Sequence, residues 1–292
     1  MGSPDLDAAA RFLAASGRVL DRRRFERHFA GGAARPVRDA VAAYRNDDGG
    51  FGHALEPDGR APGSQPAALQ LALRTLHEVD AWDEDLVAGG CDWLERSAPA
   101  EGGAMFVDPG IAGWPHAPWW RPQDGLPASL VTTGAIVGTL NARGFRHPWV
   151  ERANELMWSR VEALGEPLPY EMLGIVAFLQ TAPGRARARA AIDALADSLH
   201  RVVTLDPDAP GEVHGPLEFA PLPDSLARAV FDAGTIEAHL DHLAGAQRDD
   251  GGWTFNWPAW SPAAEADWRG SITVDALLTL RANGRLPASG PG

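Results

Sequence analysis

Three side chains that could carry out acid–base chemistry, His53, Glu56 and Asp58, lie just after a glycine-rich turn in the sequence. Burial in apolar surroundings raises the pKa of a carboxyl group, so one carboxyl could act as a general acid while the other supports it. The alternative is structural, with Glu56 and Asp58 capping helices or pairing with arginines such as Arg60. We take His53, Glu56 and Asp58 as the candidate catalytic residues.

Two further polar groups lie in segments that each precede an expected inner helix. His214 and Glu218 occupy a proline-rich loop, and Trp268 and Arg269 precede the last expected helix. Arg269 could bind a carboxylate or a diphosphate bidentately, or pair with Glu56 or Glu218, and a structural salt bridge is the more common outcome. The helix pattern described below predicts a ring of antiparallel helices, and in such a ring the loops before the inner helices gather at one end. We therefore predict one shared site, with these four residues contacting substrate.

Tryptophan is unusually frequent, with eleven tryptophans against two tyrosines. A tryptophan in a loop either fills the end of the core or lines a ligand site. Residues 99–127 form a loop too long for a simple connection, and long structured loops are usually functional. We therefore predict that Trp119 and Trp120, within this loop, contact substrate. The tryptophans in loop-like segments are Trp114, Trp119, Trp120, Trp257, Trp260 and Trp268.

The turn before His53 recurs near the other end of the chain. Residues 47–51 and 249–253 both read Asp-Asp-Gly-Gly followed by an aromatic residue, and residues 102–106 are a weaker third copy. Each of the first two copies precedes an apolar stretch opened by a serine, Ser64 or Ser271. Paired glycines allow the backbone to turn sharply, so the repeat predicts structure more than chemistry.

Helical periodicity covers most of the chain, and strand signals are nearly absent. The stretches 129–140 and 172–180 contain no charged residue, which predicts helices buried on all sides. The stretches 148–164 and 184–201 carry many charges, so one side of each must face water. This alternation predicts a double ring of antiparallel helices. Further helices are expected within 5–30 (two, broken near Gly17) and at 37–44, 64–79, 84–97, 224–231, 234–246 and 271–282.

The second copy, Gln247 to Trp253, resembles the QW repeat of the terpenoid cyclase and protein prenyltransferase superfamily. The first copy has Arg45 in place of the glutamine and Phe51 in place of the tryptophan. The resemblance implies an all-α fold, an α/α toroid of about six helix pairs. It implies a single toroid domain over residues 1–285. Residues 286–292 are expected to form a disordered tail, as chain ends often do.

The chemistry of that superfamily does not transfer residue by residue. Its Asp-x-Asp-Asp acid motif is absent, and the nearest run, residues 83–85, is typical of a helix cap. The aspartate pairs 47–48 and 249–250 lack the third carboxylate of a magnesium motif. Cys91 has no partner for a zinc site, and the histidines of helix 234–246 lack a third ligand. We predict no metal.

Composition excludes several classes of partner and cofactor. The net charge of −13 disfavours nucleic acid and anionic membranes. No lysine occurs, which excludes a Schiff base, a pyridoxal phosphate anchor and a phosphate-loop lysine. No dinucleotide fingerprint is found, so we expect no cofactor. The single cysteine, the absence of an apolar run of about 18 residues and the lack of a signal-peptide pattern predict a cytoplasmic protein without a transmembrane segment.

Three functions are compatible with these patterns. The first is a terpenoid cyclase-like enzyme that binds a small apolar or prenyl-type substrate, because aromatic rings stabilise carbocations. The second is a carbohydrate-active hydrolase or lyase, which would use stacked tryptophans and paired carboxylates. The third is a non-catalytic ligand-binding or interaction protein. The uncharged stretches, with Leu130, Ile136, Ile175 and Phe178, favour the first.

Overall fold

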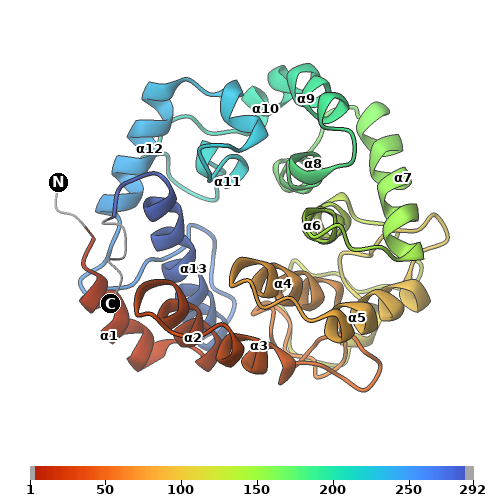
Figure 1. Ribbon diagram of the computed structural model, residues 1–292, viewed down its shortest axis with the longest axis horizontal. Helices are drawn as coiled ribbons and strands as arrows, with labels where there is room; N and C mark the ends of the chain where they lie inside the picture. The colour runs from red at the N-terminus through yellow and green to blue at the C-terminus, as the bar shows by residue number, and fades with distance from the viewer. Residues whose placement is uncertain (1–3, 287–292) are drawn as a thin grey trace. The chain divides into compact units, whose positions relative to one another are not determined.

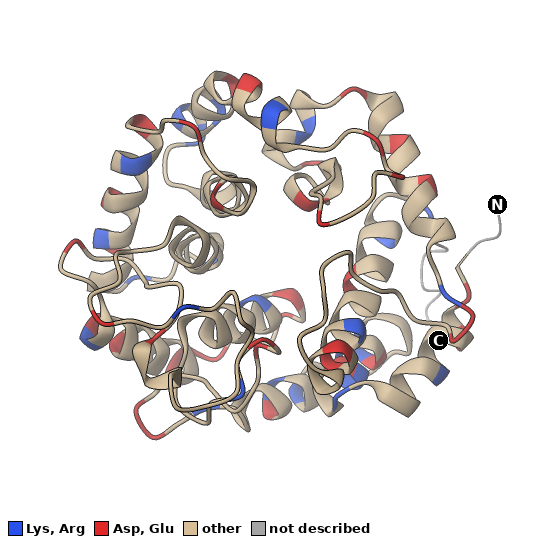
Figure 2. Cartoon of the chain, turned by 180° about the vertical axis from the view of Figure 1, so that it is seen from behind, with Lys and Arg blue, Asp and Glu red and all other residues tan. Residues whose placement is uncertain are grey.

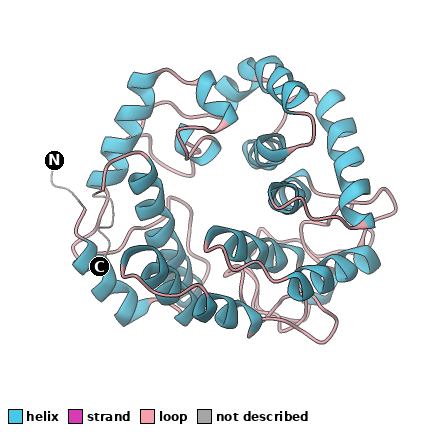
Figure 3. Ribbon diagram, viewed as in Figure 1, coloured by secondary structure: helices cyan, strands magenta, loops and turns pink. Residues whose placement is uncertain are grey.

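The computed structural model describes residues 4–286, and all regular elements in this range are helical (Figure 3). The chain divides into two compact units. The first unit contains the residues up to 40 and from 203 onward, and the second contains residues 41–202. No helix in the described range is long and apolar enough to cross a membrane. The single domain expected over residues 1–285 stays a prediction.

The second unit has two layers of helices, which Figure 1 shows side by side. Charged residues are frequent in the layer expected to be outer, whereas α6 carries none (Figure 2). Ile136, Ile175 and Phe178 are fully buried, as predicted, and Leu130 is half-buried. One layer consists of α4 (Pro66–Glu78), α6 (Leu130–Ala142) and α8 (Pro169–Thr181), and the other of α5 (Glu84–Ser97), α7 (Pro148–Glu162) and α9 (Arg185–Ala194), followed by α10 (Ala196–Val202).

Helices α6 and α8 touch through glycines. A Cβ atom on Gly134 would lie 2.1 Å from the carbonyl oxygen of Gly174. A Cβ atom on Gly174 would lie 2.1 Å from the carbonyl oxygen of Leu130. Because any side chain would collide with backbone here, the two helices pack at a distance that only glycine permits.

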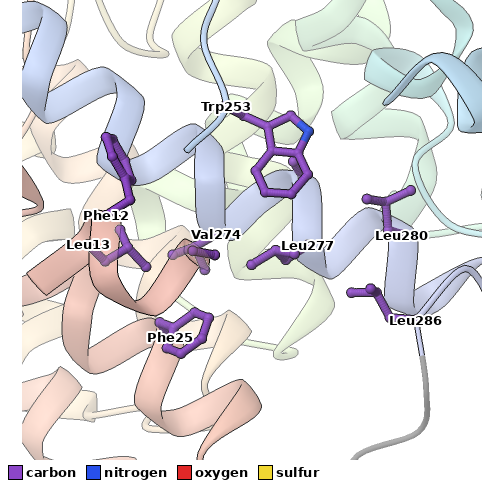
Figure 4. Close-up of a cluster of buried hydrophobic side chains, with 10 residues drawn as sticks. Phe12, Leu13, Phe25, Trp253, Val274, Leu277, Leu280 and Leu286 are labelled. Atoms are coloured by element: carbon purple, nitrogen blue, oxygen red, sulfur yellow. The ribbon is translucent and has the colours of Figure 1, made fainter. Parts of the chain in front are cut away.

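The first unit is built around a cluster of buried apolar side chains, which Figure 4 shows between α1, α2 and α13. Phe12 and Phe25 pack there with Trp253, the aromatic residue of the second turn, and with Leu277. Leu286, where the predicted tail begins, is buried in this cluster, and residues 287–292 lie outside the described range. The helices are α1 (Leu6–Ser16), α2 (Val19–Phe29), α11 (Pro216–Phe219), α12 (Ala233–Gly245) and α13 (Pro262–Ala282), and α3 (Arg35–Ala42) spans the boundary between the units.

The last helix begins nine residues earlier than predicted. Ser261 caps it by accepting a hydrogen bond from the amide of Ala264 at 3.1 Å, and a proline at the first helical position favours this start. The prediction that Ser271 opens the helix was therefore wrong. Trp268 and Arg269 lie within α13 and not in a loop.

The predicted cap of α4 was also wrong. Gln65 occupies the N-cap position, and the Ser64 hydroxyl instead donates a hydrogen bond to Asp48 at 2.8 Å. The cap predicted at residues 83–85 is confirmed, because Asp83 accepts a backbone hydrogen bond at the start of α5. Asp5 does the same at the start of α1. The expected helix at 184–201 is two helices, α9 and α10, and the one at 224–231 is a 3-10 turn, η2 (Leu226–Val230).

Candidate functional site

The two Asp-Asp-Gly-Gly turns have the same backbone geometry. In each, the second aspartate, Asp48 or Asp250, accepts a hydrogen bond from the amide two residues later, at 2.8 and 3.0 Å. The first glycine, Gly49 or Gly251, has a φ of 89° or 91°, in the region that favours glycine. The second aspartate of each pair therefore serves the turn itself.

The third, weaker copy adopts a similar turn. Gly102 has a φ of 87°. The Ala104 amide donates to the Thr133 hydroxyl at 2.9 Å, as the Trp253 amide donates to the Thr273 hydroxyl at 2.9 Å in the second turn. Ala104 thus occupies the position that an aromatic residue holds in the other two turns.

The chain leaves the first turn through two strained residues. His53 and Ala54 have φ values of 55° and 61°, a conformation that costs a non-glycine residue roughly 1–2 kcal/mol. The exposed His53 is held by its amide, which donates to the Ala61 carbonyl at 3.0 Å, and by its ring, whose Nε2 lies 2.9 Å from Asn46 Oδ1. This backbone directs residues 55–59 into the interior, where all five are buried. Such outliers gather at functional sites.

Glu56 and Asp58, the predicted catalytic carboxyls, are only 8% and 7% exposed. Glu56 Oε2 accepts a hydrogen bond from the Asp58 amide at 2.8 Å. Asp58 Oδ2 accepts one from the indole Nε1 of Trp119 at 3.1 Å, and the Asp58 carbonyl accepts the Ala117 amide at 2.8 Å. The structure therefore brings Trp119 to the candidate carboxyls from far along the chain.

Glu56 lines a narrow crevice in which no water molecule fits. The Trp120 ring lines one side of the crevice. It packs directly against Gly59, where an added Cβ atom would lie 2.8 Å from the ring. Gln65 lines the crevice too, and its side-chain amide exchanges hydrogen bonds with the backbone of Asp108 at 3.0 and 3.4 Å. Sequence analysis missed Gln65, because nothing in the sequence indicates its distant partner.

His214 and Glu218 form a hydrogen-bonded pair in the first unit, with His214 Nδ1 lying 2.8 Å from Glu218 Oε2. Glu218 Oε1 also accepts the Gly215 amide at 3.0 Å and so caps α11. Burial lowers the pKa of His214, but the hydrogen bond to Glu218 and the charges of Glu218 and Glu212 outweigh it. The pKa of His214 is therefore raised above its ordinary value.

Arg269 forms a structural salt bridge. Its Nη2 lies 2.8 and 2.7 Å from the two carboxylate oxygens of Asp250, and its guanidinium stacks 4.6 Å above the Phe12 ring. Burial raises the pKa of Asp250, but Arg269 and the Gly252 amide hold it below its ordinary value. Trp268 meets Trp257 edge-on, with ring centroids 5.5 Å apart.

Each unit thus holds part of the predicted site. His53, Glu56, Asp58, Trp119 and Trp120 come together in the second unit. The polar pairs at 214–218 and 268–269 lie in the first unit, and one site shared by both units stays a prediction. Across residues 4–286, no three His, Cys, Asp or Glu side chains are grouped to hold a metal ion.

A larger groove, about 680 Å³, lies between α7 and α9 and contains none of the predicted site residues. It is lined by Trp158, Glu162 and Arg187, among others. The Arg187 guanidinium already covers the Trp158 ring at 3.8 Å and pairs with Glu162. The groove is wide open to solvent, so we do not assign the site there.

No protein-family model and no curated protein matches the chain. Among solved structures, the chain is similar to the type II terpene cyclase MstE from Scytonema, in the apo form of a single-site variant. The match has 12% sequence identity and a TM-score of 0.56, and it covers 96% of this chain and 87% of that one. At this identity the likeness shows the fold alone. The predicted class, an all-α fold of the α/α toroid type, is thereby confirmed.

Proposed function

We propose that the protein is terpenoid cyclase-like, binds an isoprenoid-type apolar substrate, and uses Glu56 as the general acid. One observation carries the proposal: the Glu56 carboxyl lines a crevice beside the ring of Trp120, with one oxygen held by a backbone amide. The fold shared with a type II terpene cyclase supports it. Membership of the QW-repeat superfamily is supported by the positive φ of the first glycine in all three turns and by the amide-to-threonine hydrogen bond that the second and third turns share.

The proposed chemistry depends on the contacts of Glu56. The proposed acid is Glu56 in its protonated form, which carries one transferable proton while Oε2 accepts the Asp58 amide. Transfer of that proton to an alkene breaks the O–H bond and uses the π electrons to form a C–H bond. The products are a carbocation on the substrate and a Glu56 carboxylate. An aromatic face such as that of Trp120 stabilises a cation.

Other predicted residues take different parts in this proposal. Asp58 positions the loop that carries Trp119 and Trp120, and His53 holds the strained backbone before Glu56. Substrate contacts by His214, Glu218 and Trp268 belong to the proposal as well. We assign Arg269 to the second turn, because its guanidinium binds Asp250.

A thermal-shift screen tests the proposal. Farnesyl and geranylgeranyl diphosphate should raise the melting temperature, whereas oligosaccharides should not. Glu56→Gln keeps an acceptor for the Asp58 amide but has no acid proton, so its melting temperature should stay within about 2 °C of the wild type and the ligand-induced shift should remain, while conversion of the ligand, followed by mass spectrometry, disappears. Glu166→Gln, at an exposed position, is the matched control and should keep both the shift and the conversion. A Glu56→Gln variant that unfolds many degrees earlier would instead show a structural role.

A carbohydrate-active enzyme is the second candidate, because two tryptophans of the segment that contacts Asp58 are open to solvent. Trp114 is 49% and Trp119 40% exposed, and such rings stack on sugars. Stabilisation by oligosaccharides but not by prenyl diphosphates, lost in Trp119→Ala, would favour this function over the first.

A further inference from the structure

The crevice at Glu56 is closed in this conformation. Glu56 is 8% exposed, and the space beside its carboxyl has no room for a water molecule. Ligand sites in proteins usually enclose about 300–1,000 Å³. A substrate can therefore reach Glu56 only after one of the elements that line the crevice has moved.

The element best able to move is the loop that carries Trp120, residues 114–124, which we call the tryptophan loop. The other lining residues belong to the mostly buried segment 52–61 and to the start of α4, in the packed layer of the unit. The tryptophan loop is mostly exposed and lies between two glycines, Gly113 and Gly125, around which a Cβ atom would meet nothing within 4 Å. Exposed segments of this kind open at the lowest free energy, and glycines often serve as hinges.

Three hydrogen bonds join the tryptophan loop to the segment that holds Glu56. Two are backbone bonds, from the Ala117 amide to the Asp58 carbonyl at 2.8 Å and from the Arg60 amide to the Pro115 carbonyl at 2.9 Å. The third joins side chains, from the Trp119 indole to the Asp58 carboxylate at 3.1 Å. The third is the strongest in kind, because its acceptor is a carboxylate.

We infer that the tryptophan loop is a lid over Glu56, and that the hydrogen bond between Trp119 and Asp58 is its latch. When the lid opens, the Trp120 ring leaves Gly59 and the Glu56 carboxyl becomes accessible. The inference rests on the proposed function of Glu56, and it names Trp119 as a positioning residue for that site.

Hydrogen exchange measured by mass spectrometry or NMR tests the latch without any ligand. Trp119→Phe keeps an aromatic ring but removes the indole donor. Exchange of the Ala117 and Arg60 amides should then accelerate about tenfold. Asp58→Asn keeps a neutral acceptor and should give a smaller acceleration. Trp114→Phe, in the same loop but without a hydrogen bond to the carboxyls, should leave both amides unchanged. Exchange in α6 and α8 should be the same in every variant.

Equal exchange in Trp119→Phe and Trp114→Phe would overturn the latch. Wild-type exchange at Ala117 and Arg60 as fast as in an unstructured peptide would overturn the lid. A second measurement is the association rate of farnesyl diphosphate, followed by tryptophan fluorescence. It distinguishes failure of the lid or the latch from failure of the proposed function. Faster association in Trp119→Phe supports lid and function together. Faster exchange with no binding in any variant supports the lid and overturns the isoprenoid proposal.

Discussion

The first and second Asp-Asp-Gly-Gly turns differ in the contacts that fix them and in the segments that come after them. Asp48 of the first turn accepts the neutral hydroxyl of Ser64, whereas Asp250 of the second binds the cation of Arg269. The first turn continues into strained backbone and two buried carboxyls, Glu56 and Asp58. The second continues into stacked aromatic rings, with the centroids of residues 255 and 257 lying 4.5 Å apart.

The comparison separates the packing contacts that both turns share from the carboxyl groups that could carry out catalysis. Each turn presses its first glycine against the backbone of a neighbouring helix, Gly49 against Gly89 of α5 and Gly251 against Ala8 of α1. The feature that the turns share is therefore a packing device. The buried carboxyls occur after only one of the two turns, which is why we place the proposed acid there.

The largest effect is expected from removing that packing device. A Cβ atom on Gly49 would lie 2.5 Å from the Gly89 carbonyl oxygen, and one on Gly251 would lie 2.3 Å from that of Ala8. Both glycines also have positive φ. Gly49→Ala and Gly251→Ala should each lower the free energy of unfolding by roughly 3 kcal/mol, measured by urea denaturation.

Gly144→Ala is the matched control for these two variants. Gly144 has a φ of 61°, but a Cβ atom there would meet nothing within 4 Å. Its loss should be limited to the conformational cost, about 1 kcal/mol. A small loss at only one of the two turns would show that the turns are not equivalent.

A smaller effect is expected from changing the contacts that fix the second turn. Arg269→Met removes the salt bridge to Asp250 and the stacking on Phe12, and should cost roughly 1–2 kcal/mol at pH 7. The folded pKa of Asp250 lies below its ordinary 3.8, so the salt bridge stabilises the fold above that pH and is lost as the pH falls through the folded value. The difference from wild type should therefore shrink at pH 3.

Arg146→Met removes the same charge at an exposed position and should cost less than about 0.5 kcal/mol at either pH. At the first turn, Ser64→Ala should cost about 1 kcal/mol at pH 7, because it removes only hydrogen bonds of a hydroxyl. If Arg269→Met cost no more than Arg146→Met, the assignment of Arg269 to the second turn would be wrong.

The smallest effect concerns the pair formed by His214 and Glu218. This pair lies next to the segment that follows the second turn, where the Asn256 side chain donates a hydrogen bond to the Val213 carbonyl at 2.8 Å. The folded pKa of His214 is raised above 6.5, so its pairing with Glu218 stabilises the fold fully below pH 6.5 and less as the pH rises through the raised value. Glu218→Gln should cost about 1 kcal/mol at pH 5.5 and less at pH 9. A loss that does not change with pH would show that Glu218 acts only as the cap of α11.

Much of the fold could be predicted from the sequence because its signals are local. The absence of charge in α6 and in residues 172–180 of α8 indicated their burial, and Asp83 marked a helix start through a nearby amide. The start of α13 was missed because Gly270 and Ser271, inside the helix, resemble a break followed by a cap, although residues 263–266 are good helix formers. The pair Ser261–Pro262 was the available signal, since serine caps a helix and proline fits its first position.

The candidate site was predictable only in part. The density of acids after the first turn indicated Glu56 and Asp58, but their distant partners left no pattern in the sequence. The hydrogen bond from Trp119 to Asp58 spans 61 residues, and the contact of Gln65 with Asp108 spans 43. Ser64 has the residue type of a helix cap yet serves Asp48, because tertiary contacts outweigh a local preference.

The glycine contact between α6 and α8 limits how this protein can evolve. At Gly134 and Gly174 a single added methyl group would have to push two backbones apart, so even the mildest mutation there disturbs both helices. Adaptation to new ligands is therefore easier in the loops that precede the helices, where insertions and substitutions meet few neighbours. We expect selection for altered specificity to accumulate changes in residues 114–124 and to leave this helix pair untouched.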